Sequence, residues 1–352
     1  MKTFDFAKEI EALSFISGIS GCEEKTAEFF ARRLETLCDE VKTDAMGNVL
    51  GIIRAESENA PTILIDSHSD EIGFLVCEHA GGGFVRLARV GGMDPGVLPA
   101  SEVILYGEET VRAVVAAKPP HLLSAEDRKK KRKLEDLFVD TLLDDETCRR
   151  LCPIGTPVGF SDGVVKLAEH KIASRGLDDR VAGLTLLALA EALEKKALKA
   201  NVALLFSVQE EVGGMGAKVA AFGLAPDTCL AVDVSFATFP GGEGRLLEMG
   251  KGAGISYSDT LSRTLTRDVI RVANEKEIPF QLLAEPGETG TNAHDIQVAG
   301  RGVASTIISL PLSYMHSPSE VIDTRDLESA VQLMKAYCEN AKFFPEEVQI
   351  VG

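Results

Sequence analysis

Apolar runs alternate with amphipathic stretches over most of the chain, outside a segment near its middle. The amphipathic stretches repeat apolar residues at helical spacing and predict helices at 180–195, 261–277 and 324–342. The apolar runs are too short for helices and predict strands that are buried on both faces. These runs span residues 62–66, 201–208, 229–233, 280–284 and 304–310. Because such strands and helices pack as a helix-covered sheet, we predict an α/β fold with a mostly parallel sheet.

The pattern changes between about residues 71 and 165, where short runs alternate apolar and polar residues and glycine-rich turns separate them. This texture is typical of antiparallel strands with one buried face. A charged stretch at 124–137 predicts a helix with an exposed face. We therefore predict a larger α/β domain formed by residues 1–70 and 166–352, with a small β-rich domain, 71–165, inserted into it.

Net charge and cysteine content limit the partners that the protein is expected to bind and the compartment in which it is expected to work. The 352 residues carry a formal net charge of −17, so nucleic acids and anionic membranes are poor partners. Seven scattered cysteines predict free thiols in a reducing compartment rather than a disulfide framework. Residues 1–18 contain acids where a signal peptide would be apolar, and no apolar stretch approaches the roughly 20 residues of a membrane span. We predict a cytoplasmic location.

Two adjacent carboxylates, Glu210 and Glu211, follow the predicted strand at 201–208 and precede a glycine-rich turn. Their like charges repel, so the stability of the fold alone gives no reason for the pair at this position. A divalent metal does give a reason, because one carboxylate can bind the ion while its neighbour takes a proton from metal-bound water. A solvated pair at a helix start is the alternative, since helix amino termini favour negative charge.

Further polar residues stand at or just past the other predicted strand ends, where ligands bind in open α/β sheets. These are His68, Asp233 and His316, and Asp178 stands at the start of a predicted helix. Taken alone, each residue fits an ordinary buried histidine, a loop or turn residue, or a helix cap better than a metal ligand. Together with Glu211 they offer two imidazoles and three carboxylates, which suit a pair of zinc or cobalt ions. Two divalent ions and a bridging hydroxide would bring these acids close to neutrality, which matters for a buried site.

Five segments resemble, in the same order, motifs of the dimetal aminopeptidases typified by glutamyl aminopeptidase and the tetrahedral, self-compartmentalising aminopeptidases. The segments are 66–74 (DSHSDEIGF), 177–180 (LDDR), 210–217 (EEVGGMGA), 233–237 (DVSFA) and 314–323 (YMHSPSEVID). The similarity is collinear over nearly the whole chain, and five motifs in one order are far more specific than any one of them.

The resemblance implies a zinc-peptidase-like fold and a role for each motif residue. His68 and Asp233 are expected to bind one ion, Glu211 and His316 the other, and Asp178 both. Glu210 is expected to be the general acid/base.

The same resemblance assigns Asp70 to the catalytic machinery, where it orients and polarises His68 from behind. The Asp178–Asp179 peptide bond is expected to be cis, as in related sites. The implied reaction is hydrolysis of the amino-terminal residue of short peptides through a metal-bridging hydroxide. The larger domain would be catalytic, and the β-rich domain would join subunits into dimers that assemble into a tetrahedral dodecamer.

Two other readings stay open from the residues themselves. A related dimetal hydrolase, such as a deacylase, a carboxypeptidase or an endoglucanase-type glycosidase, would keep the acids but change the substrate. The glycosidase is disfavoured, since sugar clefts typically use aromatic platforms and the chain has no tryptophan and only four tyrosines. A non-catalytic assembly protein is disfavoured by Glu210 and Asp70, which are not needed merely to hold metals. The preferred residue, the physiological metal and the choice between dimer and dodecamer are left open.

Overall fold

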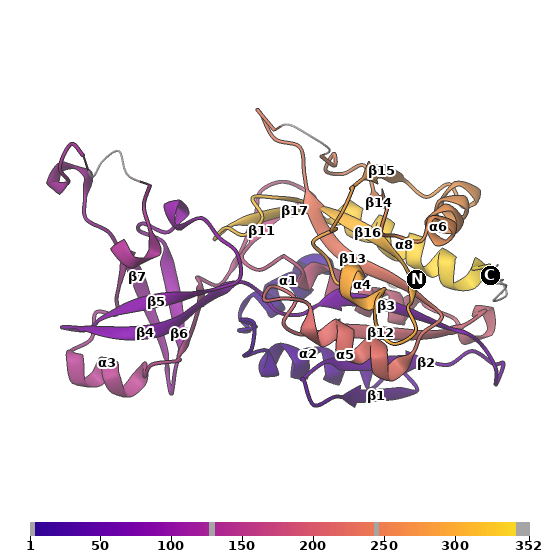
Figure 1. The fold of residues 1–352 in the computed structure, drawn as a ribbon, viewed down its shortest axis with the longest axis horizontal. Coiled ribbons are helices and arrows are strands. Elements are labelled where there is room, and N and C mark those ends of the chain that lie inside the picture. Colours follow the sequence, from indigo (N-terminus) through magenta and orange to yellow (C-terminus); the bar gives the residue numbers. More distant parts are fainter. Residues whose placement is uncertain (1–3, 127–130, 243–245, 343–352) are drawn as a thin grey trace, which may run out of the picture.

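A computed structural model describes residues 4–126, 131–242 and 246–342. Figure 1 shows two parts, a small β-barrel on the left and a helix-covered sheet on the right. Within the described residues, no helix combines the length and the apolarity needed to cross a membrane.

An eleven-stranded sheet forms the larger part. Its strands are β1 (Glu40–Thr43), β2 (Val49–Ile53), β3 (Thr62–His68), β10 (Val164–Lys166), β11 (Lys171–Ser174), β12 (Asn201–Ser207), β13 (Thr228–Phe236), β14 (Ala253–Tyr257), β15 (Phe280–Ala284), β16 (Ala304–Ser313) and β17 (Glu320–Asp323). The order is β1-β2-β12-β3-β13-β16-β17-β11-β10, and β14 pairs with both β16 and β15.

The sheet is mixed, which corrects the expectation of a mostly parallel one. Its four central strands, β12, β3, β13 and β16, run parallel as predicted. The flanking pairs β1–β2, β2–β12, β16–β17, β17–β11 and β11–β10 are antiparallel, and so is the β14–β16 pair. The pairs β1–β2, β10–β11 and β16–β17 are joined by short turns, which only antiparallel neighbours permit.

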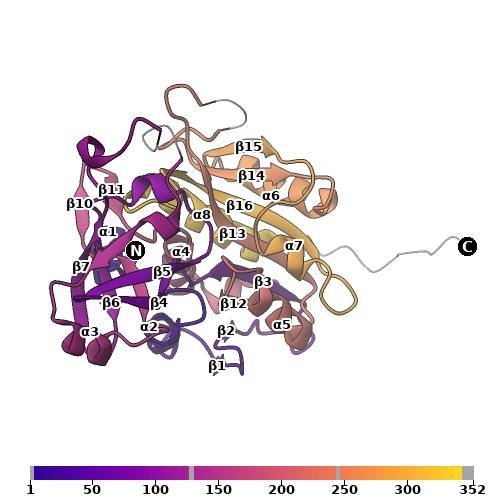
Figure 2. The same cartoon turned by 60° about the vertical axis from the view of Figure 1, so that its left-hand side comes forward.

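Helices cover both faces of the sheet (Figures 1 and 2). Ile63 and Ile65 of β3 pack with α1, α2, α4, α6 and α8, whereas Leu64 packs with α5 and α7 on the opposite face. This alternation explains why the run is apolar throughout, because successive side chains point to opposite faces that are both buried. The helices are α1 (Phe6–Ser14), α2 (Glu24–Leu34), α4 (Arg180–Ala192), α5 (Met215–Leu224), α6 (Arg263–Glu275), α7 (Ala293–Ile296) and α8 (Thr324–Asn340).

The smaller part is a closed barrel in the strand order β4-β5-β8-β7-β6-β9. The strands are β4 (Gly73–Gly81), β5 (Phe84–Val90), β6 (Glu102–Tyr106), β7 (Thr110–Ala116), β8 (Phe138–Asp140) and β9 (Pro157–Phe160). Alternate residues of β7 are buried and exposed, as expected where one face lines a core. Phe74, Val103 and Val139 belong to this separate core, and α3 (Asp145–Leu151) packs against it.

The helix predicted at 124–137 is wrong for the part of this stretch that the structure describes. Residues 127–130 lie outside the described residues, and from residue 131 onward the chain forms only a short 3-10 turn, η4 (Leu134–Asp136). The other 3-10 turns among the described residues are η1 (Pro95–Val97), η2 (Pro120–Leu122) and η5 (Lys195–Ala197). Ten of the fourteen residues of this stretch are charged, and it lacks the apolar stripe that docks a helix onto a core.

Candidate metal centre

The carboxyl ends of the central strands bring the predicted residues to one edge of the sheet. β3 ends at His68, which pairs in register with Ser207, the last residue of β12, so Glu210 and Glu211 follow at the same level. His316 follows the end of β16. Asp233 differs from the sequence expectation, because β13 does not end there but continues to Phe236.

Asp178 reaches the same edge from the loop between β11 and α4. Its peptide bond to Asp179 is cis in the structure. The side chain of Asp178 is the centre of the arrangement. Oδ1 lies 3.2 Å from Nε2 of His68, and Oδ2 lies 3.2 Å from Nε2 of His316.

The five predicted ligands form two groups that share Asp178. One group is His68, Asp178 and Asp233, and the other is Asp178, Glu211 and His316; in each, the candidate ligand atoms lie within 4.8 Å of one another. Nε2 of His68 is 3.9 Å from Oδ1 of Asp233, and Nε2 of His316 is 3.2 Å from Oε1 of Glu211. The structure therefore gathers all five residues into two groups with Asp178 common to both.

The donor atoms fit a pair of zinc-like ions. Ligand atoms bound to one zinc at about 2.0–2.2 Å lie roughly 3.4 Å apart in tetrahedral geometry, close to the 3.2–3.9 Å separations observed here. Oε1 of Glu211 is buried and accepts no hydrogen bond, although Nε2 of His316 is near. A buried carboxylate oxygen without a donor is costly, and a cation between these groups would satisfy it.

The electrostatics of the groups also favour positive charge at this place. Burial lowers the pKa of His316, but the close approach of Asp178 and Glu211 raises it to about 11. His68 responds in the same way, with its pKa raised well above the usual value by Asp178 and Asp70 against the effect of burial. Carboxylates that stabilise a positive imidazole so strongly would stabilise a divalent cation at the same position.

Glu210 stands beside the first group without belonging to either. Its Oε2 lies 3.9 Å from Nε2 of His68. Burial, reinforced by the charge of Glu211, raises the pKa of Glu210 to about 8, although His68 opposes the shift. A carboxylate with a pKa near neutrality can both accept and return a proton, which is what a general acid/base requires.

Asp70 touches both the first histidine and the acidic pair. Its backbone carbonyl oxygen lies 3.1 Å from Nδ1 of His68, so Nδ1 carries the hydrogen and Nε2 faces Asp178. The Asp70 carboxylate lies 3.4 Å from the same Nδ1 and accepts hydrogen bonds from the backbone N–H groups of Glu210 and Glu211. One buried side chain thus fixes segments that are about 140 residues apart.

Comparison with known proteins identifies the family to which the chain belongs. A model of the family described as M42 glutamyl aminopeptidase matches residues 47–333, a range that contains both groups, Asp70 and Glu210. The chain belongs to the M42 glutamyl aminopeptidase family. Membership makes it a metal-dependent aminopeptidase, which confirms the recognition made from the sequence motifs.

Relatives of this M42 peptidase match it from end to end. The lysyl aminopeptidase of Pyrococcus furiosus is 33% identical over 92% of this chain and 94% of its own. An aminopeptidase from the archaeon Desulfurococcus kamchatkensis has a similar structure, with a TM-score of 0.89 and 31% identity over 96% of this chain and 95% of its own. The TET1 peptidase of Pyrococcus horikoshii, which can assemble into a tetrahedron or a large octahedral shell, matches with a TM-score of 0.84 and 30% identity over 95% and 99%.

Several residues that support the site were not predicted from the sequence. Ser20 donates a hydrogen bond of 2.5 Å from Oγ to Oδ2 of Asp70. Glu320 accepts hydrogen bonds from backbone N–H groups at Asp178 and His316. Such contacts leave no spacing or composition signal, because serine and glutamate are common and the partners lie far away in the sequence.

A buried ionic network, which we call the Glu71 network, lies directly behind the two groups. It consists of Glu71, Arg175 and Arg180. Nη1 of Arg175 donates to Oε1 of Glu71 over 2.5 Å, and Nη2 of Arg180 lies 3.2 Å from Oε2. Glu71 directly follows Asp70, and Arg180 directly follows the Asp178–Asp179 pair. The network therefore links the segment that carries Asp70 to the loop that carries Asp178.

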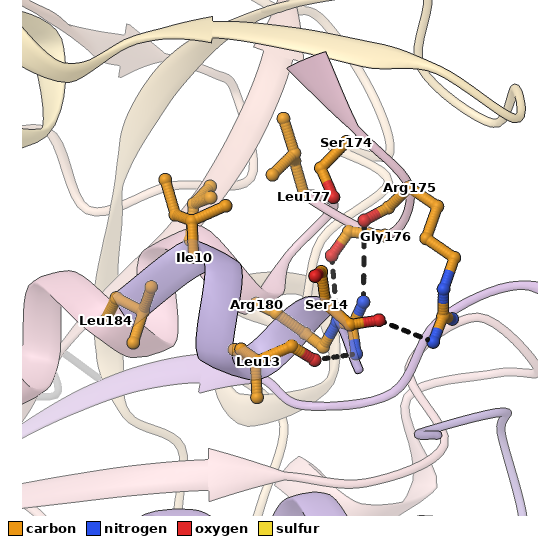
Figure 3. A pocket seen from close by; sticks show the side chains of 10 residues that line it. Ile10, Leu13, Ser14, Ser174, Arg175, Gly176, Leu177, Arg180 and Leu184 are labelled. Carbon is orange, nitrogen blue, oxygen red and sulfur yellow. Dashed lines mark hydrogen bonds between the residues drawn. The ribbon is translucent and has the colours of Figure 1, made fainter. Parts of the chain in front are cut away.

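The end of α1 supplies further acceptors to the Glu71 network (Figure 3). Arg175 donates to the carbonyl oxygen of Ser14, and Arg180 donates to that of Leu13. Arg175 also donates to the hydroxyl oxygen of Tyr106 in the barrel strand β6. Buried guanidinium groups need such partners, and here three parts of the chain provide them.

We expect Glu71→Gln to lower the free energy of unfolding by about 3–5 kcal/mol, because it leaves two buried guanidinium groups without a carboxylate. Denaturant unfolding followed by circular dichroism measures the change. Glu191→Gln, at an exposed position of α4, is the control and should stay within about 0.5 kcal/mol of wild type. Equal stability of the Glu71 variant and this control would contradict the role given to the network.

Proposed function

We propose that the protein removes the amino-terminal residue of short peptides with two divalent ions, zinc or cobalt, at the two groups. His68 and Asp233 would hold one ion, Glu211 and His316 the other, and Asp178 both. The observation that carries the proposal is the position of Asp178, whose two oxygens each face a different histidine at 3.2 Å.

The bound ions would supply Lewis acidity, which lowers the pKa of water toward neutrality and polarises a peptide carbonyl. The protein's own contribution is proton transfer and positioning. Glu210 accepts the proton of the attacking water and returns it to the nitrogen of the leaving amine. Asp70 keeps Glu210 and His68 in place through the contacts described above. The excess of carboxylates near the site also favours the positively charged amino terminus of a peptide, which supports an exopeptidase.

Chromogenic aminoacyl anilides test the substrate class. We expect hydrolysis of anilides with a free α-amino group and none of the amino-terminally blocked forms. A panel of amino acids would also rank the preferred residue. Cleavage of blocked peptides alone, or of cellulose oligomers, would reject the aminopeptidase reading in favour of another dimetal hydrolase.

Chelation tests the dependence on metal. We expect dialysis against a chelator to reduce hydrolysis to background, because Glu210 alone cannot generate a sufficient nucleophile at neutral pH. Adding zinc or cobalt should restore it as the metal content approaches two ions per chain, measured by elemental analysis. Full activity of a metal-free protein would contradict the proposal.

We further propose that the barrel mediates dimer formation and that dimers assemble into a tetrahedral dodecamer. The tetrahedral particle of the Pyrococcus horikoshii relative supports this assembly. Light scattering at a known concentration would separate monomer, dimer and dodecamer. All seven cysteines are free thiols, which supports the reducing cytoplasm as the location.

A further inference from the structure

Glu320 is a buried carboxylate whose hydrogen bonds all come from the backbone around two candidate ligands. It is the first residue of β17 and only 1% exposed. Oε1 accepts the backbone N–H of His316 over 2.9 Å. Oε2 accepts the N–H groups of Leu177 and Asp178 over 2.7 and 3.1 Å. Three backbone N–H groups thus meet the two oxygens of one buried side chain, and these contacts fix the backbone at both places.

The loop that carries His316 needs this support. Tyr314 and His316 have φ angles of 62° and 59°, which residues other than glycine rarely adopt. Such a conformation persists only where its surroundings enforce it. The side chain of His316 is also 33% exposed, against 2% for His68, so packing restrains it less. The hydrogen bond from its N–H to Glu320 is therefore a principal restraint on this ligand.

Glu320 contacts two of the three residues of the second group, His316, which belongs to that group alone, and Asp178, which is shared with the first group. The two residues that belong only to the first group, His68 and Asp233, make no contact with Glu320 among the described hydrogen bonds. Asp178 and Glu320 lie 142 positions apart in the sequence. One carboxylate thus joins the loop before α4 to the loop before β17.

We propose that Glu320 is a positioning residue that sets the affinity of the second group for its ion by holding Asp178 and His316 at the right separation. This inference rests on the proposed function, because it requires the two groups to bind metal.

Metal titration of Glu320→Gln tests the role. The amide has nearly the same volume, but its NH2 end cannot accept the N–H groups that now meet the carboxylate. We expect one of the two ions to bind 10–100-fold more weakly, as is typical when the partners of metal ligands are lost, while the other changes by less than a few fold. The full-length chain, stripped of metal, is titrated with cobalt chloride. Calorimetry gives the two affinities, and the cobalt absorption spectrum reports coordination.

Asp326→Asn is the matched control. Asp326 is also buried and accepts two backbone N–H groups, those of Gly250 and Gly252, over 2.7 and 2.8 Å. It has no contact with either group among the described hydrogen bonds and ion pairs, so both affinities should equal those of wild type. This control separates the loss of any buried carboxylate from the loss of the one at Glu320.

Each outcome of the titration bears either on the role of Glu320 or on the proposed function. A folded Glu320→Gln with two unchanged affinities overturns the inference, and so does equal weakening of both ions. If that variant does not fold, Glu320→Asp replaces it, since a shorter carboxylate keeps the charge but cannot span both loops. Misfolding of both variants also overturns the inference, because the fold would then require the residue. A wild-type chain that binds fewer than two cobalt ions refutes the proposed function instead.

Discussion

Glu210→Gln is expected to lower turnover by about 10²–10⁴-fold while the protein keeps two metal ions per chain. The reason is that Glu210 stands 3.9 Å from His68 but outside both groups, so the proposed function assigns it the proton rather than an ion. An amide of the same size cannot accept a proton from water. The comparison therefore requires kcat on an aminoacyl anilide and metal content measured on the same preparation.

The neighbouring residue is the control for this prediction. Glu211→Gln alters a member of the second group, so we expect it to lose an ion as well as activity. Two adjacent substitutions of the same kind should thus differ in metal content. If Glu210→Gln also lost an ion, or kept its turnover, the division of labour between the two carboxylates would be wrong.

Asp178→Asn is expected to release both ions and to reduce hydrolysis at least as far as Glu210→Gln. Asp178 is the one residue common to both groups, and its replacement removes a negative charge and one of the two oxygens that face the histidines. Two histidines and two carboxylates would remain, split between separate groups of two ligands each. Elemental analysis after gel filtration measures the loss, and Asp326→Asn again serves as the buried-carboxylate control.

Retention of one ion with measurable activity would show that Asp178 serves a single group. The same experiment on His68→Ala and His316→Ala should release one ion in each case. The three variants together distinguish a shared ligand from two independent sites.

The centre of the fold could be predicted from the sequence, whereas its edges could not. Apolar runs such as those of β3 and β16 indicate strands covered on both faces, and these strands are parallel as expected. The direction of the short strand β17, between β16 and β11, depends on a turn through Tyr314 and His316 with positive φ angles. Such angles are uncommon for residues other than glycine, so the sequence does not mark these two positions for that conformation.

The same distinction applies to the candidate site. His68, Glu211 and His316 could be found because strand ends in α/β sheets converge on ligands, a rule that depends only on locating strands. Asp233 could be found although the end of β13 was misplaced by three residues, because the strand itself was clear. Three other residues act at one remove. Glu320 holds backbone groups, Ser20 contacts Asp70, and Arg175 contacts Glu71; only coordinates reveal such contacts.

The hydrogen bond from Arg175 to Tyr106 has a consequence for how the barrel can diverge. Tyr106 is the last residue of the barrel strand β6. Its hydroxyl is one of the acceptors for the buried guanidinium group of Arg175, which lies behind the two groups. Barrel strands and turns away from Tyr106 can therefore vary in length and surface chemistry. The part of the barrel around Tyr106 must keep the shape that allows this hydrogen bond. A barrel taken from a related protein would replace this one successfully only if it also provided a hydrogen-bond acceptor for Arg175.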